Sequence, residues 1–285
     1  MPSTTGAAPR VRRSWWLEEA LAAEPGVPCP PLDRAIDAEI AIVGGGYTGM
    51  WTAYQITERH PDADVVILEQ DICGGGPSGR NGGFVNGWWE DVAEWVHRFG
   101  ANDAMELGLT ADRSVRAIPA FCERHGIDAW WTDAPELGAA TAAAHEGSWR
   151  GTVAATTALG FPDIFEELTR EQVRAICDSP TFRTGVLAHG TGTVQPARLA
   201  RGLRRVLLER GVRIYEDTPL RRLEAGSPVT LRTASGSVRA RDVVLAINAW
   251  AGTWRQFRSR IAVRGTYIVL TEPRSEEHTS ELQSH

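Results

Sequence analysis

The feature that most constrains the fold is a strand pattern that runs directly into a glycine-rich turn. Residues 38–43 (AEIAIV) have strand character, and Gly44, Gly46 and Gly49 follow in the spacing G-x-G-x-x-G. In dinucleotide-binding folds the first glycine permits a tight turn, the second lets the backbone approach a pyrophosphate, and the third allows close helix–strand packing. Residues 47–59 have the amphipathic pattern of that helix, whose N-terminus would offer N–H groups to phosphates. This stretch predicts a Rossmann-like α/β fold.

An acidic residue after the next apolar run limits which dinucleotides the site could bind. Residues 64–68 predict a second buried strand, and Glu69 follows at about 20 residues beyond the last glycine, the spacing of a ribose-hydroxyl acceptor. An acidic rather than a basic residue here argues against a 2′-phosphate on that ribose. The alternative, an ordinary turn with a solvated glutamate, would require strand, glycines, helix and acid to coincide by chance.

A second glycine-rich loop, residues 73–83 (CGGGPSGRNGG), favours a flavin over a nicotinamide. In a plain NAD domain the chain usually enters a helix here, whereas this loop holds six glycines, which permit close backbone approach to a flat or anionic ligand. Ser78 can donate to phosphate, Arg80 can offset its charge, and Asn81 can donate and accept at a polar ring edge. A flexible surface loop is the alternative interpretation.

Four segments together resemble the D-amino-acid-oxidase-type family of FAD-dependent oxidoreductases, and within it the gamma-glutamylputrescine oxidase-like bacterial amine oxidases. They are SWWLEEAL (14–21), AEIAIVGGGYTGMWTAY (38–54), VVILEQDICGGGPSGRNGGF (65–84) and VVLAINAWAG (243–252). The resemblance extends over residues 14–273, and its motifs are specific for FAD but not for a substrate. It implies FAD as cofactor and hydride transfer from an amine or amino acid to the flavin.

The resemblance also implies cofactor contacts along both loops and beyond them. Backbone near Leu220 is expected to meet the adenine, and the corner after residues 243–247 is expected to pass the cofactor. Ile247 and Asn248 stand there in place of the usual glycine or threonine. The predicted cofactor-binding residues are Gly44, Gly46, Tyr47, Thr48, Gly49, Glu69, Gln70, Ser78, Gly79, Arg80, Asn81, Gly82, Gly83, Leu220 and Ala246. No general base is assigned, because flavin amine oxidation requires mainly orientation, a dry cavity and electrostatics from the protein.

The order of the patterns predicts a discontinuous domain arrangement. An N-terminal extension (1–36) precedes an FAD-binding domain formed by residues 37–130 and 193–260. A partial substrate domain is formed by residues 131–192 and 261–273. The predicted fold class is therefore α/β, a Rossmann-like FAD-binding domain with a second, incomplete α+β substrate domain.

Local patterns predict further elements in the middle of the chain. Apolar residues at helical spacing predict helices over 91–99 and 103–125, and Trp130-Trp131 suggests a buried strand-like segment. The alanine-rich residues 139–144 predict a helix or a linker. Thr169 with a glutamine three residues later predicts a capping box.

The patterns near the C-terminus predict a return to the nucleotide sheet. Pro196 is expected in the first turn of a helix that ends at Gly211, followed by a strand over 212–215. Residues 230–233 and 237–240 predict a hairpin.

Charge and cysteine content exclude several classes of protein. The formal net charge of −6 gives no reason to expect a nucleic acid or an anionic membrane as partner. The four cysteines are widely separated and predict neither a metal site nor a disulfide framework. Cys73 could in principle carry a covalent flavin, but a small buried side chain is the better interpretation. No secretory signal or membrane-spanning run is evident, so a cytoplasmic location is expected.

The last twelve residues, RSEEHTSELQSH (274–285), match the translation of a common sequencing-adapter sequence. They have no apolar periodicity and are expected to be a non-native polar tail. The resembled enzymes continue well past Pro273, so the chain is expected to be an N-terminal fragment that is itself inactive.

The sequence therefore predicts an FAD-dependent oxidoreductase that oxidises the C–N bond of an amine or amino acid. Its expected partners are that small substrate and an electron acceptor, either oxygen or another redox partner. The alternatives are an NAD-linked dehydrogenase, against which the loop over 73–83 argues, and a catalytically inactive nucleotide-binding fragment.

Overall fold

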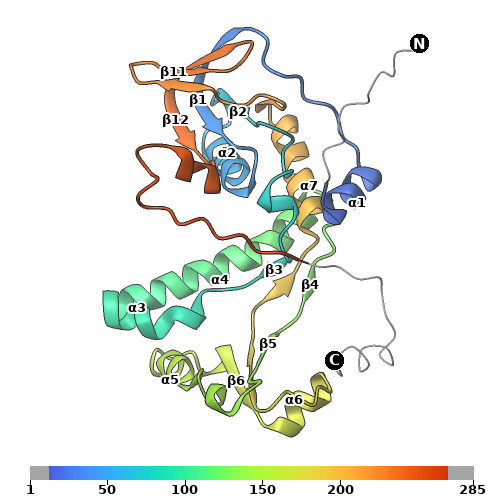
Figure 1. Ribbon diagram of the computed structural model, residues 1–285, viewed down its shortest axis with the longest axis vertical. Helices are drawn as coiled ribbons and strands as arrows, with labels where there is room; N and C mark the ends of the chain where they lie inside the picture. Colours follow the sequence, from blue (N-terminus) through green and yellow to red (C-terminus); the bar gives the residue numbers. More distant parts are fainter. Residues whose placement is uncertain (1–12, 269–285) are drawn as a thin grey trace, which may run out of the picture. The chain divides into compact units, whose positions relative to one another are not determined.

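The computed structural model describes residues 13–268, which divide into two compact units (Figure 1). Among these residues, unit 1 comprises 13–82, 127–129 and 195–266, and unit 2 comprises 83–126, 130–194 and 267–268. Within residues 13–268, no helix combines the length and the apolar character needed to cross a bilayer.

Unit 1 is built on a six-stranded sheet with the strand order β10-β11-β12-β1-β2-β9. Strands β12, β1, β2 and β9 are parallel, whereas β10, β11 and β12 pair antiparallel. The bounds are β1 (Ala35–Val43), β2 (Val65–Leu68), β9 (Arg213–Tyr215), β10 (Arg222–Glu224), β11 (Val229–Arg232) and β12 (Ser237–Leu245). This arrangement confirms the predicted Rossmann-like α/β class and the predicted hairpin.

Among the described residues of unit 1 there are three α-helices: α1 (Trp15–Ala23), α2 (Tyr47–Arg59) and α7 (Pro196–Glu209). Helix α2 connects β1 to the parallel β2, begins after Gly46 and packs against α7. Pro196 occupies the first turn of α7, as predicted, because its missing N–H is not needed there. Gly211, at φ +82°, follows the helix end and leads into β9.

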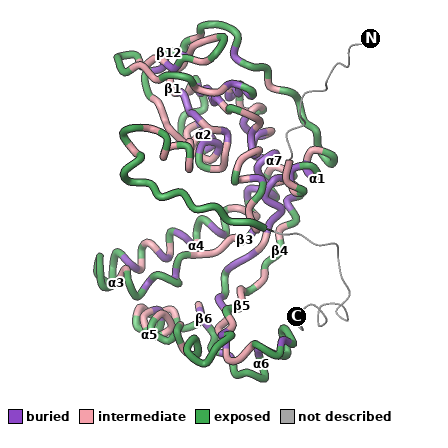
Figure 2. Tube along the Cα trace, viewed as in Figure 1, coloured by how far each residue is buried: buried purple, intermediate pink, exposed green. Residues whose placement is uncertain are grey.

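The core of unit 1 explains why the second apolar run is a strand. All four side chains of β2 are buried, which is expected of a parallel strand covered on both faces. Ile67 is 0% exposed, and burying such a side chain stabilises the fold by about 1.5–3 kcal/mol. Figure 2 shows buried residues along most of α7, and in β1 burial is confined to the last three residues.

Unit 2 contains two three-stranded antiparallel sheets, ordered β3-β8-β4 and β5-β7-β6, and four α-helices among its described residues. The strands are β3 (Phe84–Val85), β4 (Thr132–Asp133), β5 (Glu136–Ala139), β6 (Phe165–Leu168), β7 (Gly185–Ala188) and β8 (Gly192–Thr193). The helices are α3 (Val92–Phe99), α4 (Ala101–Arg124), α5 (Arg150–Ala158) and α6 (Arg170–Ile176). The capping box at Thr169 is present, as predicted.

The predicted domain ranges differ from this division mainly over residues 83–126, and also over residues 261–266, which were assigned to the substrate domain but belong to unit 1. Residues 83–126 were assigned to the FAD-binding domain, but they belong to unit 2, where α3 packs against both α4 and α5. Amphipathic patterning over 91–125 predicts the helices correctly, but it does not indicate which unit their apolar faces contact. The functional assignment of the two units stays a prediction.

Three local expectations have different outcomes. Trp130-Trp131 is not a buried strand: Trp130 is 43% exposed at φ +52°, and β4 begins only at Thr132. Of the two alternatives for residues 139–144, a helix or a linker, the structure has the linker, since β5 ends at residue 139 and only a short 3₁₀ turn follows. The expected polar tail (274–285) lies outside the described residues.

Candidate cofactor site

A cavity of about 400 Å³ lies within unit 1 at the carboxyl ends of its parallel strands. Val43 pairs in register with Leu68 of β2 and with Leu245 of β12, so these three strands end side by side. In open α/β sheets this edge is where nucleotides bind. Val43, Leu68 and the residues that follow all three strands line the cavity.

The first glycine turn has the geometry that its motif requires. Gly44 adopts φ +111°, and a Cβ there would lie 2.4 Å from the carbonyl oxygen of Ala246. A Cβ on Gly49 would lie 2.0 Å from the carbonyl oxygen of Gly44, so only glycine lets α2 begin this close to the turn. Gly46 lines the cavity, and a Cβ there would meet only the Ser78 hydroxyl oxygen, at 3.1 Å.

The second glycine loop contacts the first at the N-terminus of α2. The Tyr47 N–H donates to Ser78 Oγ at 2.8 Å, and the Gly74 N–H donates to the Gly45 carbonyl at 2.9 Å. Ser78 lies in a short 3₁₀ turn, η1 (Pro77–Gly79), and Arg80 follows this turn. Both residues line the cavity. The positive end of the α2 dipole therefore coincides with a serine and an arginine, a combination that suits an anionic ligand.

Glu69 is fixed by two backbone donors at the end of β2. Its Oε2 accepts from the Gly45 N–H at 2.7 Å, and its Oε1 accepts from the Asp71 N–H at 2.9 Å. Burial raises the pKa of the carboxyl group, although these two hydrogen bonds favour its charged form. Each carboxylate oxygen has further acceptor capacity, so Glu69 can also accept from a hydroxyl in the cavity.

A buried ion pair anchors the inner side of the second loop. Glu216, directly after β9, accepts from the Cys73 N–H at 2.8 Å and from Arg204 Nε at 2.8 Å. Cys73 is 0% exposed and is absent from the cavity wall, and burial raises the pKa of its thiol well above the ordinary value. A buried, protonated thiol is a poor nucleophile, which fits the interpretation of Cys73 as a small buried side chain.

The cavity brings together ten of the fifteen predicted cofactor-binding residues. These are Gly44, Gly46, Tyr47, Thr48, Glu69, Gln70, Ser78, Arg80, Leu220 and Ala246. The other five, Gly49, Gly79, Asn81, Gly82 and Gly83, do not line it. Asn81, for example, donates from Nδ2 to the carbonyl oxygens of Pro77 and Ser78 and so closes its own turn. The role of all fifteen as cofactor contacts stays a prediction.

Several residues that line the cavity carry no motif and were missed in the sequence. Arg13 and Ser14 come from the segment that begins α1, and Thr218 comes from the loop after β9. The corner after β12 contributes a further set, Ile247, Asn248, Trp250, Thr253 and Trp254. Two of these places had a signal through the family resemblance, residues 14–21 for Ser14 and residues 243–252 for the corner. Arg13 and Thr218 had none, because they reach the cavity through tertiary packing.

The residues of the cavity fit a dinucleotide, and specifically FAD. Gly46 leaves room for backbone approach where a methyl group would fill the wall, and the α2 N-terminus with Arg80 suits a pyrophosphate. Leu220 and Val43 supply apolar surface, and Glu69 supplies the hydroxyl acceptor. The extension of the wall through Ser78 and Arg80 into the second loop gives room beyond a mononucleotide.

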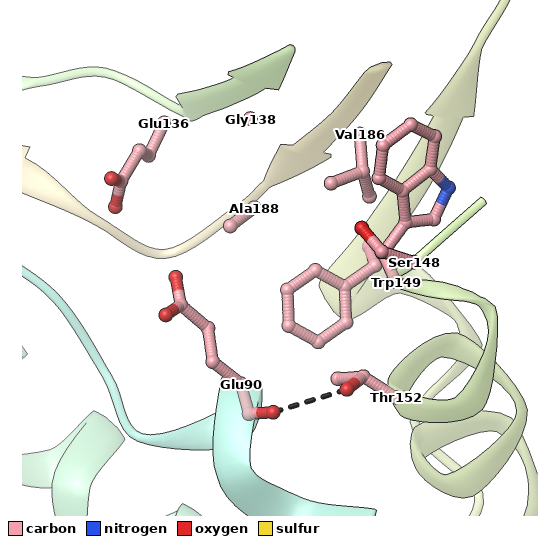
Figure 3. Close-up of a pocket in the computed structure, with 9 residues that line it drawn as sticks. Glu90, Glu136, Gly138, Ser148, Trp149, Thr152, Val186 and Ala188 are labelled. Carbon is pink, nitrogen blue, oxygen red and sulfur yellow. Dashed lines mark hydrogen bonds between the residues drawn. The ribbon is translucent and has the colours of Figure 1, made fainter. Parts of the chain in front are cut away.

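A second cavity, of about 270 Å³, lies within unit 2, and the charged residues that line it are both acidic. Figure 3 shows the carboxylates of Glu90 and Glu136 on its wall. Phe165 and Trp149 also line this cavity. Burial, followed by the nearby charges of Glu136 and Asp91, raises the pKa of Glu90. Two carboxylates repel a pyrophosphate, so this cavity does not suit a dinucleotide.

Comparisons with known proteins agree with this site. Residues 39–284 match the DAO family, described as FAD dependent oxidoreductase. The chain is 32% identical over 242 residues to the probable oxidoreductase OrdL of Rhizobium meliloti (strain 1021), covering 83% of this chain and 55% of that protein. It is 29% identical over 267 residues to the gamma-glutamylputrescine oxidoreductase of Escherichia coli (strain K12), covering 90% of this chain and 60% of that protein.

Solved structures show the same fold at lower identity. The glycine oxidase of Geobacillus kaustophilus superposes with a TM-score of 0.64 at 23% identity, covering 76% of this chain and 56% of that one. The matched part of the chain spans 55% of the length of the Rhizobium meliloti protein and 60% of the length of the Escherichia coli protein. The family resemblance predicted from the motifs, the α/β FAD-binding fold and the FAD cofactor class are confirmed.

Proposed function

This chain belongs to the DAO family of FAD-dependent oxidoreductases, and from that premise we propose that it binds FAD and serves the oxidation of a C–N bond. The substrate class that we propose is an amine or an amino acid. Its support is the named activity of two relatives, one acting on gamma-glutamylputrescine and one on glycine.

One observation carries the proposal: the two glycine loops meet in one cavity. The hydrogen bond from the Tyr47 N–H to Ser78 Oγ joins the phosphate-binding turn to the loop that distinguishes flavin from nicotinamide domains. An NAD-linked domain has no need for Ser78 and Arg80 at this place. The contact therefore favours FAD over NAD.

The chain's own residues would bind and orient the cofactor. The α2 N-terminus, Ser78 and Arg80 suit the pyrophosphate, Glu69 suits a ribose hydroxyl, and Leu220 suits the adenine. When bound, the flavin ring supplies the hydride acceptor for a C–H bond beside the substrate nitrogen. Among the described residues we assign none as a general base.

Cofactor titration tests the proposal first. We expect added FAD to lose fluorescence as it binds the purified chain, and NAD at the same concentration not to displace it. Displacement of FAD by NAD would favour the NAD-linked dehydrogenase, and no binding of either would contradict the proposed site. ADP is the matched control ligand, because its binding without FAD binding would indicate a mononucleotide site.

Turnover is a separate measurement. FAD-loaded protein is mixed without oxygen with an amine or an amino acid, and the absorbance of oxidised flavin is followed. Bleaching by one substrate class supports the proposed oxidation and identifies the class. FAD binding without bleaching by any amine or amino acid would favour an inactive nucleotide-binding chain.

A further inference from the structure

The two residues that precede α1, Arg13 and its N-cap Ser14, form part of the cavity wall, although they lie outside both glycine motifs. Arg13 donates from Nη2 to Asp71 Oδ1 at 2.8 Å and from Nη1 to Asp71 Oδ2, so the pair is bidentate. The next residue, Ser14, donates from Oγ to the Gly79 carbonyl at 2.8 Å. Arg13, Ser14 and Asp71 all line the cavity.

Helix α1 is held in place by contacts away from the cavity. Leu17 and Ala20 are 1% and 2% exposed and pack with Ala197 of α7. Gln195 donates from Nε2 to the Trp16 carbonyl at 2.8 Å. Glu19 forms an ion pair with Arg198. Because α1 is fixed to α7 independently, its first residues can hold the loop rather than follow it.

The contacts of Arg13 and Ser14 fall at the two ends of the loop segment that lines the cavity. Asp71 precedes Gly75, Gly76, Pro77 and Ser78 in the wall, and Gly79 follows them. The inner side of the loop is anchored at Cys73 by the buried Glu216. The outer side has partly exposed contacts, since the side chains of Arg13 and Asp71 are 22% and 33% exposed.

We propose that Arg13 and Ser14 are cofactor-positioning residues, which hold the loop over 71–79 in the conformation that receives the dinucleotide. The inference rests on the proposed FAD site. We call the contacts of Arg13 with Asp71 and of Ser14 with Gly79 the strap, which lies outside the two glycine motifs. Glycines 74, 75, 76 and 79 make this loop intrinsically free to adopt other conformations. Restricting it beforehand removes an ordering penalty from binding.

The same contacts connect the strap to the predicted ribose acceptor. Asp71, whose side chain pairs with Arg13, donates its own N–H to Glu69 Oε1. It also accepts at its carbonyl from the Asp217 N–H at 2.8 Å. Loss of the Arg13 pair therefore removes the side-chain contact of the residue that helps to orient Glu69, and leaves only its backbone contacts.

Arg13→Gln is the test, with Arg34→Gln as matched control. Arg34 also belongs to the N-terminal part of unit 1, but its pair with Asp33 is exposed and outside the cavity. We expect Arg13→Gln to raise the Kd for FAD about tenfold, because it removes a charge-assisted bidentate contact that solvent only partly screens. The control should bind FAD as the unmodified chain does.

Hydrogen exchange on the cofactor-free chain gives a readout that does not depend on FAD. We expect amides of residues 71–80 to exchange faster in Arg13→Gln, with no change in the strands of unit 1. Unchanged exchange there would overturn the strap, whether or not FAD binds. Failure of the unmodified chain to bind FAD would count against the proposed function instead.

Ser14→Ala serves as a second variant if Arg13→Gln does not fold. It removes the contact with Gly79, and also the N-cap bond that Ser14 Oγ accepts from the Leu17 N–H at 3.2 Å, while the Arg13 pair is kept. Faster exchange near residue 79 is expected from the first loss, and faster exchange confined to the first turn of α1 from the second. A wild-type exchange pattern in this folded variant would also overturn the strap.

Discussion

The glycine motif yields the sharpest prediction, because its members would tolerate a methyl group very differently. At Gly49 an added Cβ would stand 2.0 Å from the Gly44 carbonyl oxygen, whereas ordinary contact begins at about 3.4 Å. The backbone would have to move by about 1.4 Å at the start of α2. Overpacking of this kind costs about 3 kcal/mol or more, a large part of a typical domain's stability.

At Gly46 the same substitution would be mild for the fold and severe for the ligand. The nearest atom is the Ser78 hydroxyl oxygen at 3.1 Å, which a small shift relieves. Gly46 is the N-cap of α2 in an extended conformation that alanine also adopts. Replacing a capping glycine by alanine costs roughly 0.5–1 kcal/mol. In the proposed FAD complex the added methyl group would occupy the part of the cavity where we place the pyrophosphate.

We therefore expect Gly46→Ala to weaken FAD binding by about 10- to 100-fold, equivalent to roughly 1.4–2.8 kcal/mol. FAD fluorescence titration measures the affinity, and urea unfolding measures the free energy of unfolding. Gly151→Ala is the control, since a Cβ there meets nothing within 4 Å and the residue lies in α5 of unit 2. If Gly46→Ala bound FAD normally, or lost as much stability as Gly49→Ala, the assignment of Gly46 to the phosphate site would be wrong.

Three further predictions concern charge and capping. The pKa of Glu69 is higher in the folded chain than in the unfolded chain, so the free energy of unfolding should fall as the pH rises between these two pKa values. Urea unfolding at pH 4.5 to 7 measures this dependence, and Glu69→Gln should make it weaker. Glu216→Gln leaves Arg201 and Arg204 buried without their counter-charge, so urea unfolding should reveal a loss of about 3–5 kcal/mol; a loss under 1 kcal/mol would refute this. Thr169→Ala removes the capping box and should lower the free energy of unfolding by about 1 kcal/mol, whereas Thr169→Ser should keep it.

The parts of the fold that local chemistry specifies were predictable from the sequence. Helix α2 was predicted over residues 47–59 and has those bounds, because a glycine turn begins it and an amphipathic pattern continues to its end. The capping box at Thr169 and the proline at the start of α7 were predictable for the same reason. Each depends on residues within one or two turns of the chain.

The parts that tertiary packing specifies were not predictable. Trp130 has an apolar side chain but takes a left-handed backbone conformation and stays 43% exposed, and no local pattern signals this. Arg13 reaches the cavity only because α1 packs on α7, 180 residues further along the chain. Thr218 has its position because its hydroxyl accepts from the Leu32 N–H and donates to the Glu216 carbonyl.

The contact between Ser78 and α2 indicates why a single glycine motif is not enough to define this site. Ser78 Oγ accepts the N–H of Tyr47, one of the donors that a helix N-terminus would otherwise offer to an anion. The serine hydroxyl still has its own proton to donate. It can therefore form a hydrogen bond to an anionic ligand in the cavity while it accepts one from the N-terminus of α2, whose dipole favours negative charge there. The proposed anion site would then be built by two loops, and its position would depend on how the second loop is held. That loop is fixed on its inner side by Glu216 and on its outer side by Arg13 and Ser14. In the proposed site, cofactor preference would therefore depend on contacts spread across about 200 positions of the sequence, from Arg13 to Glu216, most of which lie outside the glycine motifs.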